Sequence, residues 1–277
     1  MTRLLYCECF KLIRSSSFLA LVAATIILTT LTIITAYSPS GAGGPLFMVA
    51  GMELDKIGRA IGFIGNIIDP NHVSASAVRT AFVFTILWLP VVILFATGAF
   101  SSDFISRSLT ISQAKGISQT RILISKAIVI CTAVAVCYAI SCTIAFFFKA
   151  NQYGASPDFN ALGVFFSALG LNILLLTALM TQVMCLFSLV RSPFACSLIT
   201  VLISTFVLLA YPSSYSTLSE VRASGFLLYE FSPVFYLLHT CSLSIDTDFI
   251  ALTIFYSLAS ILIALGISAV AMNRRKV

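Results

Sequence analysis

Charge is scarce in this chain. Of its 277 residues only 9% are charged and 59% are hydrophobic, whereas a soluble globular domain carries roughly 25% charged residues. An ordinary soluble fold is therefore excluded. The apolar runs are continuous and about 20 residues long, so they indicate membrane-spanning helices rather than the roughly 10-residue alternating strands of a membrane barrel.

Several motifs are also missing. No GxxxxGK[ST] stretch occurs, so the chain itself does not cradle ATP phosphates in the usual way. Neither His72 nor His239 has an HxxxH or ExxH partner, and we predict no catalytic, cofactor-binding or metal site. The basic residues are scattered rather than clustered, which argues against nucleic-acid binding. Cysteines lie mostly within apolar runs, and no extracellular disulfide can be drawn.

Six apolar runs predict an all-α integral membrane protein with six transmembrane helices in a single domain, 1–277. The first run is too long for a signal peptide and is expected to be an uncleaved anchor. The predicted spans are 18–37, 81–101, 125–148, 159–189, 194–211 and 249–272.

The basic residues also predict the orientation of the chain. With the N-terminus inside, eleven of the 16 Lys and Arg residues lie in cytoplasmic segments and five lie outside. Eight of the ten acidic residues fall outside. Because cytoplasmic loops are enriched in Lys and Arg, both termini are predicted to be cytoplasmic.

Residues 2–15 predict an amphipathic interface helix on the inner membrane surface. One face carries Leu5, Cys9, Leu12 and Ile13. The polar and charged residues of this segment are Glu8, Lys11, Arg14 and Ser15. The alternative is a plain helical extension of the first span.

Two long segments are predicted to lie outside the cell. In the segment 38–80, four isoleucines between Ile57 and Ile68 recur at helical spacing, which predicts an amphipathic helix at the outer leaflet. The segment 212–248 holds two short apolar blocks broken by Ser232 and Pro233. They predict a pair of re-entrant outer-leaflet helices before the sixth span.

The segment 102–124 predicts a short cytoplasmic amphipathic helix between the second and third spans, ended by Gly116. Apolar residues there alternate with charged and hydroxyl residues. A second cytoplasmic turn follows the fourth span. There Ser192 predicts a helix N-cap, with Pro193 as the first helical residue.

In the segment 102–124 and the start of the third span, the sequence resembles the ABC-2 family of ABC-transporter permeases. The resemblance is to six-span bacterial subunits of peptide-antibiotic resistance and lantibiotic-immunity systems in particular. The family has an acidic residue after span two, a pattern like GT-x-R-x-x-L-x-x-G-x-S-R, and a Ser-Lys where span three begins. Arg107 stands where the family has glycine, and Gln119 where it often has arginine. Residues at matching spacings are Asp103, Ser108, Gly116, Ser118, Ser125 and Lys126.

The resemblance implies a permease subunit of an ATP-driven exporter in a bacterial plasma membrane. ATP and Mg would be bound by a separate ABC ATPase subunit, and a second permease chain, identical or different, would complete the assembly. The residues expected to couple the chain to the ATPase are Asp103, Arg107, Ser108, Lys115, Gly116, Ser118, Arg121, Lys126 and Arg191. Alternatives are an ion-coupled secondary transporter, disfavoured because carboxylates are absent from the middles of the spans, and a non-transporting sensor or scaffold.

Two polar side chains fall inside the fourth span. Asn172 and Gln182 lie about 80° apart around an ideal helix. Each is expected to hydrogen-bond either to another helix or along a translocation path. The cargo is predicted to be an amphipathic peptide, because the outer segments are apolar and carry a net negative charge.

Overall fold

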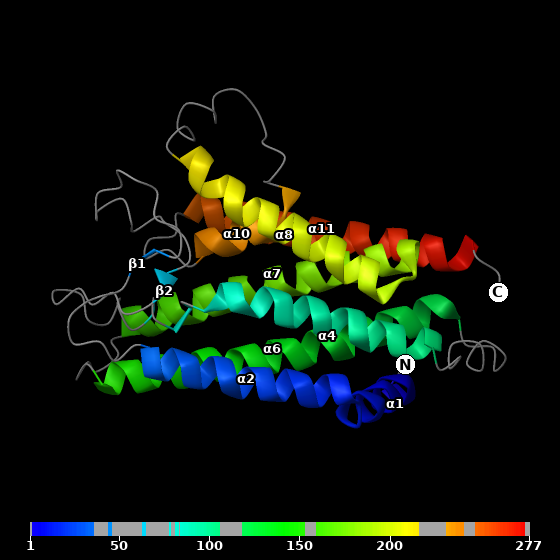
Figure 1. The fold of residues 1–277 in the computed structure, drawn as a ribbon, viewed down its shortest axis with the longest axis horizontal. Coiled ribbons are helices and arrows are strands. Elements are labelled where there is room, and N and C mark those ends of the chain that lie inside the picture. The colour runs from blue at the N-terminus through cyan, green and yellow to red at the C-terminus, as the bar shows by residue number, and fades with distance from the viewer. Residues whose placement is uncertain are drawn as a thin grey trace.

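Six long helices run side by side along the molecule (Figure 1). The computed structural model describes residues 2–35, 44–45, 63–64, 78, 81–82, 84–105, 118–152, 159–215, 231–240 and 247–274. In these residues the long helices are α2 (Ser16–Thr35), α4 (Thr85–Ile105), α6 (Gln119–Gln152), α7 (Phe159–Val190), α8 (Pro193–Tyr215) and α11 (Thr247–Arg274).

The helical class that the sequence predicts is confirmed for the described residues. Five helices, α2, α4, α6, α7 and α11, are long and apolar enough to cross a membrane. The sixth, α8, contributes a shorter apolar stretch, Pro193–Leu208. Helices suit such a sequence because they satisfy every backbone amide within the segment, away from water. These helices indicate a multi-pass membrane protein.

Two short helices lie at opposite ends of the bundle (Figure 1). The first, α1 (Thr2–Ile13), is tilted away from the long helices at the end where α11 finishes. The second, α10 (Pro233–Thr240), packs on α7 and α8 near the other end. The start of the chain and the end of α11 therefore share one end of the bundle.

The core is built around α7, which packs against α4, α6, α8, α10 and α11. Phe165 on α7 stacks between Phe82 and Phe146, with ring centroids 5.6 and 4.5 Å away. Nearby, Tyr138 meets the edge of Trp88 at 5.3 Å and shares a 2.8 Å hydrogen bond with Thr85. Aromatic packing thus joins α4, α6 and α7 toward the end of the bundle that holds α10.

The tight turn between α7 and α8 has the predicted form. Arg191 adopts a positive φ of 60°, and its backbone N–H donates to the Phe187 carbonyl at 2.9 Å, which ends α7. Ser192 then caps α8, because its hydroxyl accepts the Ala195 N–H at 3.3 Å. Pro193 is the first helical residue, so this start signal is confirmed.

Other boundaries differ from the prediction. Helix α6 begins at Gln119 rather than at Ser125, because a helix can continue through polar residues outside an apolar run. The predicted helix over 57–68 is wrong at Phe63–Ile64, which form the strand β2 paired antiparallel with β1 (Gly44–Pro45). Gly62 and Gly65, which flank Phe63–Ile64 in the sequence, disfavour a helix there.

The second predicted outer block is helical, as α10, with Ser232 capping it through the Val234 N–H. The first block, 226–229, lies outside the described residues.

Candidate functional site

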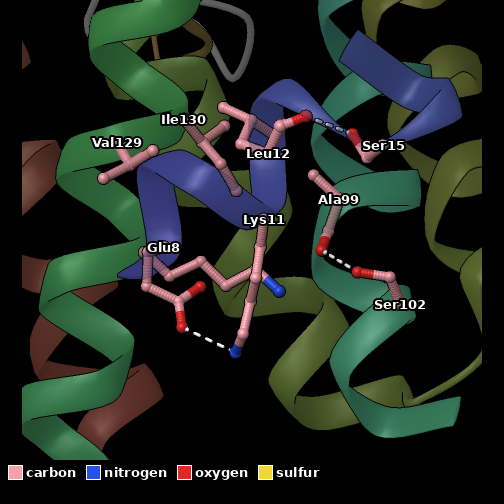
Figure 2. A pocket seen from close by; sticks show the side chains of 9 residues that line it. Glu8, Lys11, Leu12, Ser15, Ala99, Ser102, Val129 and Ile130 are labelled. Carbon is pink, nitrogen blue, oxygen red and sulfur yellow. Dashed lines mark hydrogen bonds and ion pairs between the residues drawn. The ribbon is translucent and has the colours of Figure 1, made fainter. Parts of the chain in front are cut away.

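A small cavity lies where α1 meets one end of α4 and α6 (Figure 2). We call this cluster the α1–α4–α6 junction. Its volume is about 40 Å³, room for a few water molecules. The lining residues are Glu8, Lys11, Leu12, Ser15, Ala99, Ser102, Lys126, Val129 and Ile130.

Helix α1 presents its carboxylate to this cavity. Glu8 is only 6% exposed, and its Oε1 accepts the ammonium of Lys11 at 3.1 Å (Figure 2). The two residues lie three apart, so they are neighbours on the same helix face. Lys11 remains half exposed, so this pair alone contributes little stability.

The facing helix supplies a second cation. Lys126, in the second turn of α6, is only 8% exposed and lies over the ring of Phe100 of α4, 5.6 Å from its centroid. Among the described residues that line the cavity, Glu8 is the one carboxylate. A buried charge is costly unless it is compensated, so a carboxylate on the same cavity lowers the cost of burying Lys126.

Hydroxyl groups close the helix ends around the charges. Ser15 donates to the Leu12 carbonyl at 2.7 Å, and Ser102 donates to the Ala99 carbonyl at 2.8 Å (Figure 2). The Phe18 N–H donates in turn to the Ser15 hydroxyl, which starts α2. The junction is therefore a bend in which α1 is folded back onto α6.

The structure brings together only part of the predicted site. Glu8, Lys11 and Lys126 meet at the junction. Arg14 is exposed, with its guanidinium 4.1 Å from the ring centroid of Phe10. Ser118 precedes α6, and its carbonyl accepts the Arg121 N–H at 3.0 Å.

The other predicted coupling residues lie away from this cavity or outside the described residues. Asp103 lies in the last turn of α4, and Arg121 is exposed in the first turn of α6. Arg107, Ser108, Lys115 and Gly116 lie outside the described residues. Arg191 is exposed. It lies in the turn between α7 and α8, at the end of the bundle that holds α1 (Figure 1).

The two polar residues of α7 contact different helices. The side-chain oxygen of Asn172 accepts a hydrogen bond from Thr240 of α10, while its Nδ2 is buried without a partner among the described residues. Gln182 donates through Nε2 to Ser260 at 2.9 Å and Tyr256 at 3.4 Å, both on α11. Both side chains therefore link α7 to another helix.

One buried residue was not predicted as structural. Lys149, near the end of α6, is fully buried, and its ammonium donates to the Ile33 carbonyl at 3.2 Å and to Gln152 at 2.7 Å. Ile33 lies in the last turn of α2, where carbonyls have no helical partner. In the sequence Lys149 reads only as a charge that ends an apolar run.

No family model, curated protein or solved structure matches this chain. In the described part of the chain, no three His, Cys, Asp or Glu side chains lie close enough to hold a metal ion.

Proposed function

We propose that this chain is the membrane-embedded permease subunit of an ATP-driven exporter with six transmembrane helices. The ATP would be hydrolysed, with Mg, by a separate ABC ATPase subunit, and a second permease chain would complete the transporter. The cargo would be a hydrophobic or amphipathic molecule, with a peptide antibiotic as the first candidate. Both termini would lie in the cytoplasm of a bacterial cell.

The observation that carries this proposal is the α1–α4–α6 junction. Helices α4 and α6 flank the segment 106–117, whose sequence resembles the coupling element of the ABC-2 permeases. Helix α1 is folded onto α6, and its buried Glu8 lines a cavity together with residues of α4 and α6. A partner that moved the segment would therefore act on α1, α4 and α6 together.

The turn at Arg191 supports the same proposal. The turn lies at the same end of the bundle as α1 (Figure 1), and Arg191 is exposed. An exposed arginine can pair with a carboxylate of a partner through two parallel hydrogen bonds. An ATPase bound at this end would thus have two contact points.

The test is purification of the tagged chain from its native membrane in mild detergent, with identification of bound proteins and an ATPase assay. We expect a stoichiometric partner with a P-loop and vanadate-sensitive hydrolysis. A chain that purifies alone and shows no hydrolysis would contradict the proposal and favour an ion-coupled transporter or a scaffold.

A further inference from the structure

A second, larger hollow lies along the outer face of α7 and α11. It has a volume of about 560 Å³, within the 300–1,000 Å³ typical of small-molecule sites. We call it the α7–α11 groove. Its lining on α11 runs from Leu252 to Ile267, a length of about 22 Å at the helical rise of 1.5 Å per residue.

The surface around the groove is apolar, as is typical of a surface that faces lipid. Both helices that form it are long and apolar enough to cross a membrane, and its walls carry mostly apolar side chains such as Phe255, Ile263 and Leu186. Phe255 is 74% exposed at the surface of the protein. If both helices cross the membrane, a molecule reaches this face through the hydrocarbon.

A polar notch interrupts this apolar surface near the middle of its length. Gln182 lines the groove, and its Nε2 is already engaged with Ser260 and Tyr256. The Tyr256 hydroxyl donates onward to the Phe231 carbonyl. The carboxamide oxygen of Gln182 has no hydrogen-bond partner among the described residues and remains an acceptor.

That acceptor distinguishes a ligand from a lipid tail. An acyl chain would fill the groove but leave a polar oxygen in hydrocarbon without a partner, which is costly. A molecule with one hydroxyl or amide donor would satisfy the oxygen. Ser260 lies about 12 Å from the Leu252 end and about 10 Å from the Ile267 end of the lining on α11, so the apolar body that fits beside the donor is short.

The aromatic rings of the lining lie in one half of the groove. Tyr236 and Tyr256 are stacked with ring centroids 4.3 Å apart, and Phe255 lies beside them in the lining. The half toward Ile267 is aliphatic. A flexible apolar chain therefore suits the aliphatic half, with its donor at the notch.

We propose that the α7–α11 groove binds a lipid-soluble amphipathic small molecule that donates a hydrogen bond to Gln182 and lays an apolar chain of about 10 Å along α11. The site is reached from the bilayer. It is a property of this chain alone and does not depend on the exporter proposal.

The experiment uses the purified full chain in lipid nanodiscs, with a photoactivatable medium-chain alcohol as the probe. The matched probe is the corresponding alkane without the hydroxyl. We expect saturable labelling of α11 by the alcohol, competed by unlabelled alcohol, and no saturable labelling by the alkane. Equal labelling by both probes, or no saturation, would overturn the proposal in favour of bulk lipid.

Two variants locate the site, each checked for folding by its elution profile and thermal unfolding. Gln182→Met keeps the side-chain length but removes the acceptor, and should weaken alcohol binding about fivefold to tenfold. Ala259→Phe fills the groove and should abolish saturable labelling. The control Ala251→Phe adds the same ring to an exposed position of α11 that does not line the groove, and should bind normally.

Two outcomes would count against a small-molecule site. Unchanged binding by Ala259→Phe would place the alcohol elsewhere. A change in oligomeric state by Ala259→Phe, without a change in alcohol binding, would make the groove a protein contact instead.

Discussion

At the scale of single residues, the described part of the bundle contains buried charges that need compensation. Glu8 and Lys126 line the same cavity and are 6% and 8% exposed. Charges that border one small cavity of low dielectric interact with each other more strongly than charges in water do. The effects of Glu8 and Lys126 on stability should therefore be coupled rather than independent.

A double-mutant cycle tests this coupling. We expect Glu8→Gln and Lys126→Met each to destabilise the chain, and the double variant to lose less than the sum, with an interaction energy of about 1–3 kcal/mol. The measurement is the free energy of unfolding in mixed micelles. Additive effects would show that Glu8 and Lys126 are independent. Glu8→Gln with Arg3→Gln is the control pair, because Arg3 lies on the exposed side of α1.

Lys149 gives a second prediction at this scale. Its ammonium donates a hydrogen bond to the Ile33 carbonyl in the last turn of α2, where a positive charge also interacts favourably with the helix dipole. Lys149→Met should lower the free energy of unfolding by about 1–2 kcal/mol. Lys149→Arg keeps the charge and serves as the control in the same unfolding measurement. A stability gain for the Met variant would mean that desolvation of the ammonium outweighs this contact.

At the scale of elements, the turn between α7 and α8 contains a residue, Arg191, whose cost to folding can be measured separately from its proposed role in partner contact. Arg191 is in the left-handed region, where a side chain costs about 1–2 kcal/mol and glycine costs nothing. An arginine there is unfavourable for the turn itself. Its side chain is exposed, as a role in partner contact would require.

Arg191→Gly should therefore raise the free energy of unfolding by about 0.5–1 kcal/mol, because the relief of strain exceeds the added backbone entropy. Arg191→Ala keeps the strain and should not be stabilised. If the guanidinium contacts an ATPase, both variants should lower hydrolysis in the copurified complex. Full hydrolysis by both variants would remove Arg191 from the coupling role.

The elements also show what the sequence could and could not predict. The six long helices lie within a few residues of the apolar runs, except at α6, whose polar first turn carries no hydropathy signal. The Ser192 cap was predictable because its chemistry is local. The pairing of Gly44–Pro45 with Phe63–Ile64 was not, because contacts between distant residues leave no local pattern.

The same limit applies to the candidate site. Gln182 was recognisable as a polar residue in a span, but its partners Ser260 and Tyr256 lie 78 and 74 residues away along the chain. The placement of Glu8 and Lys126 around one cavity likewise depends on how α1 folds back onto α6. Composition predicts that such groups need partners, and only the packing identifies them.

At the scale of the whole molecule, the number of crossings decides where the two ends lie. The start of the chain and the end of α11 share one end of the bundle (Figure 1). Helix α8 has a shorter apolar stretch than the other five long helices. If only those five crossed the membrane, the two ends would lie on opposite sides, whereas six crossings put both on one side.

Thiol labelling in intact cells decides between five and six crossings. Cys7 and Cys9 are exposed on α1, and a cysteine can be added after Val277 in a separate variant. With six crossings and a cytoplasmic start, a membrane-impermeant maleimide should label neither end until the cells are permeabilised. Cys241, which is predicted to lie outside but falls beyond the described residues, should be labelled without permeabilisation. Labelling of one end alone in intact cells would contradict the six-span arrangement, because a chain whose ends face opposite compartments crosses an odd number of times.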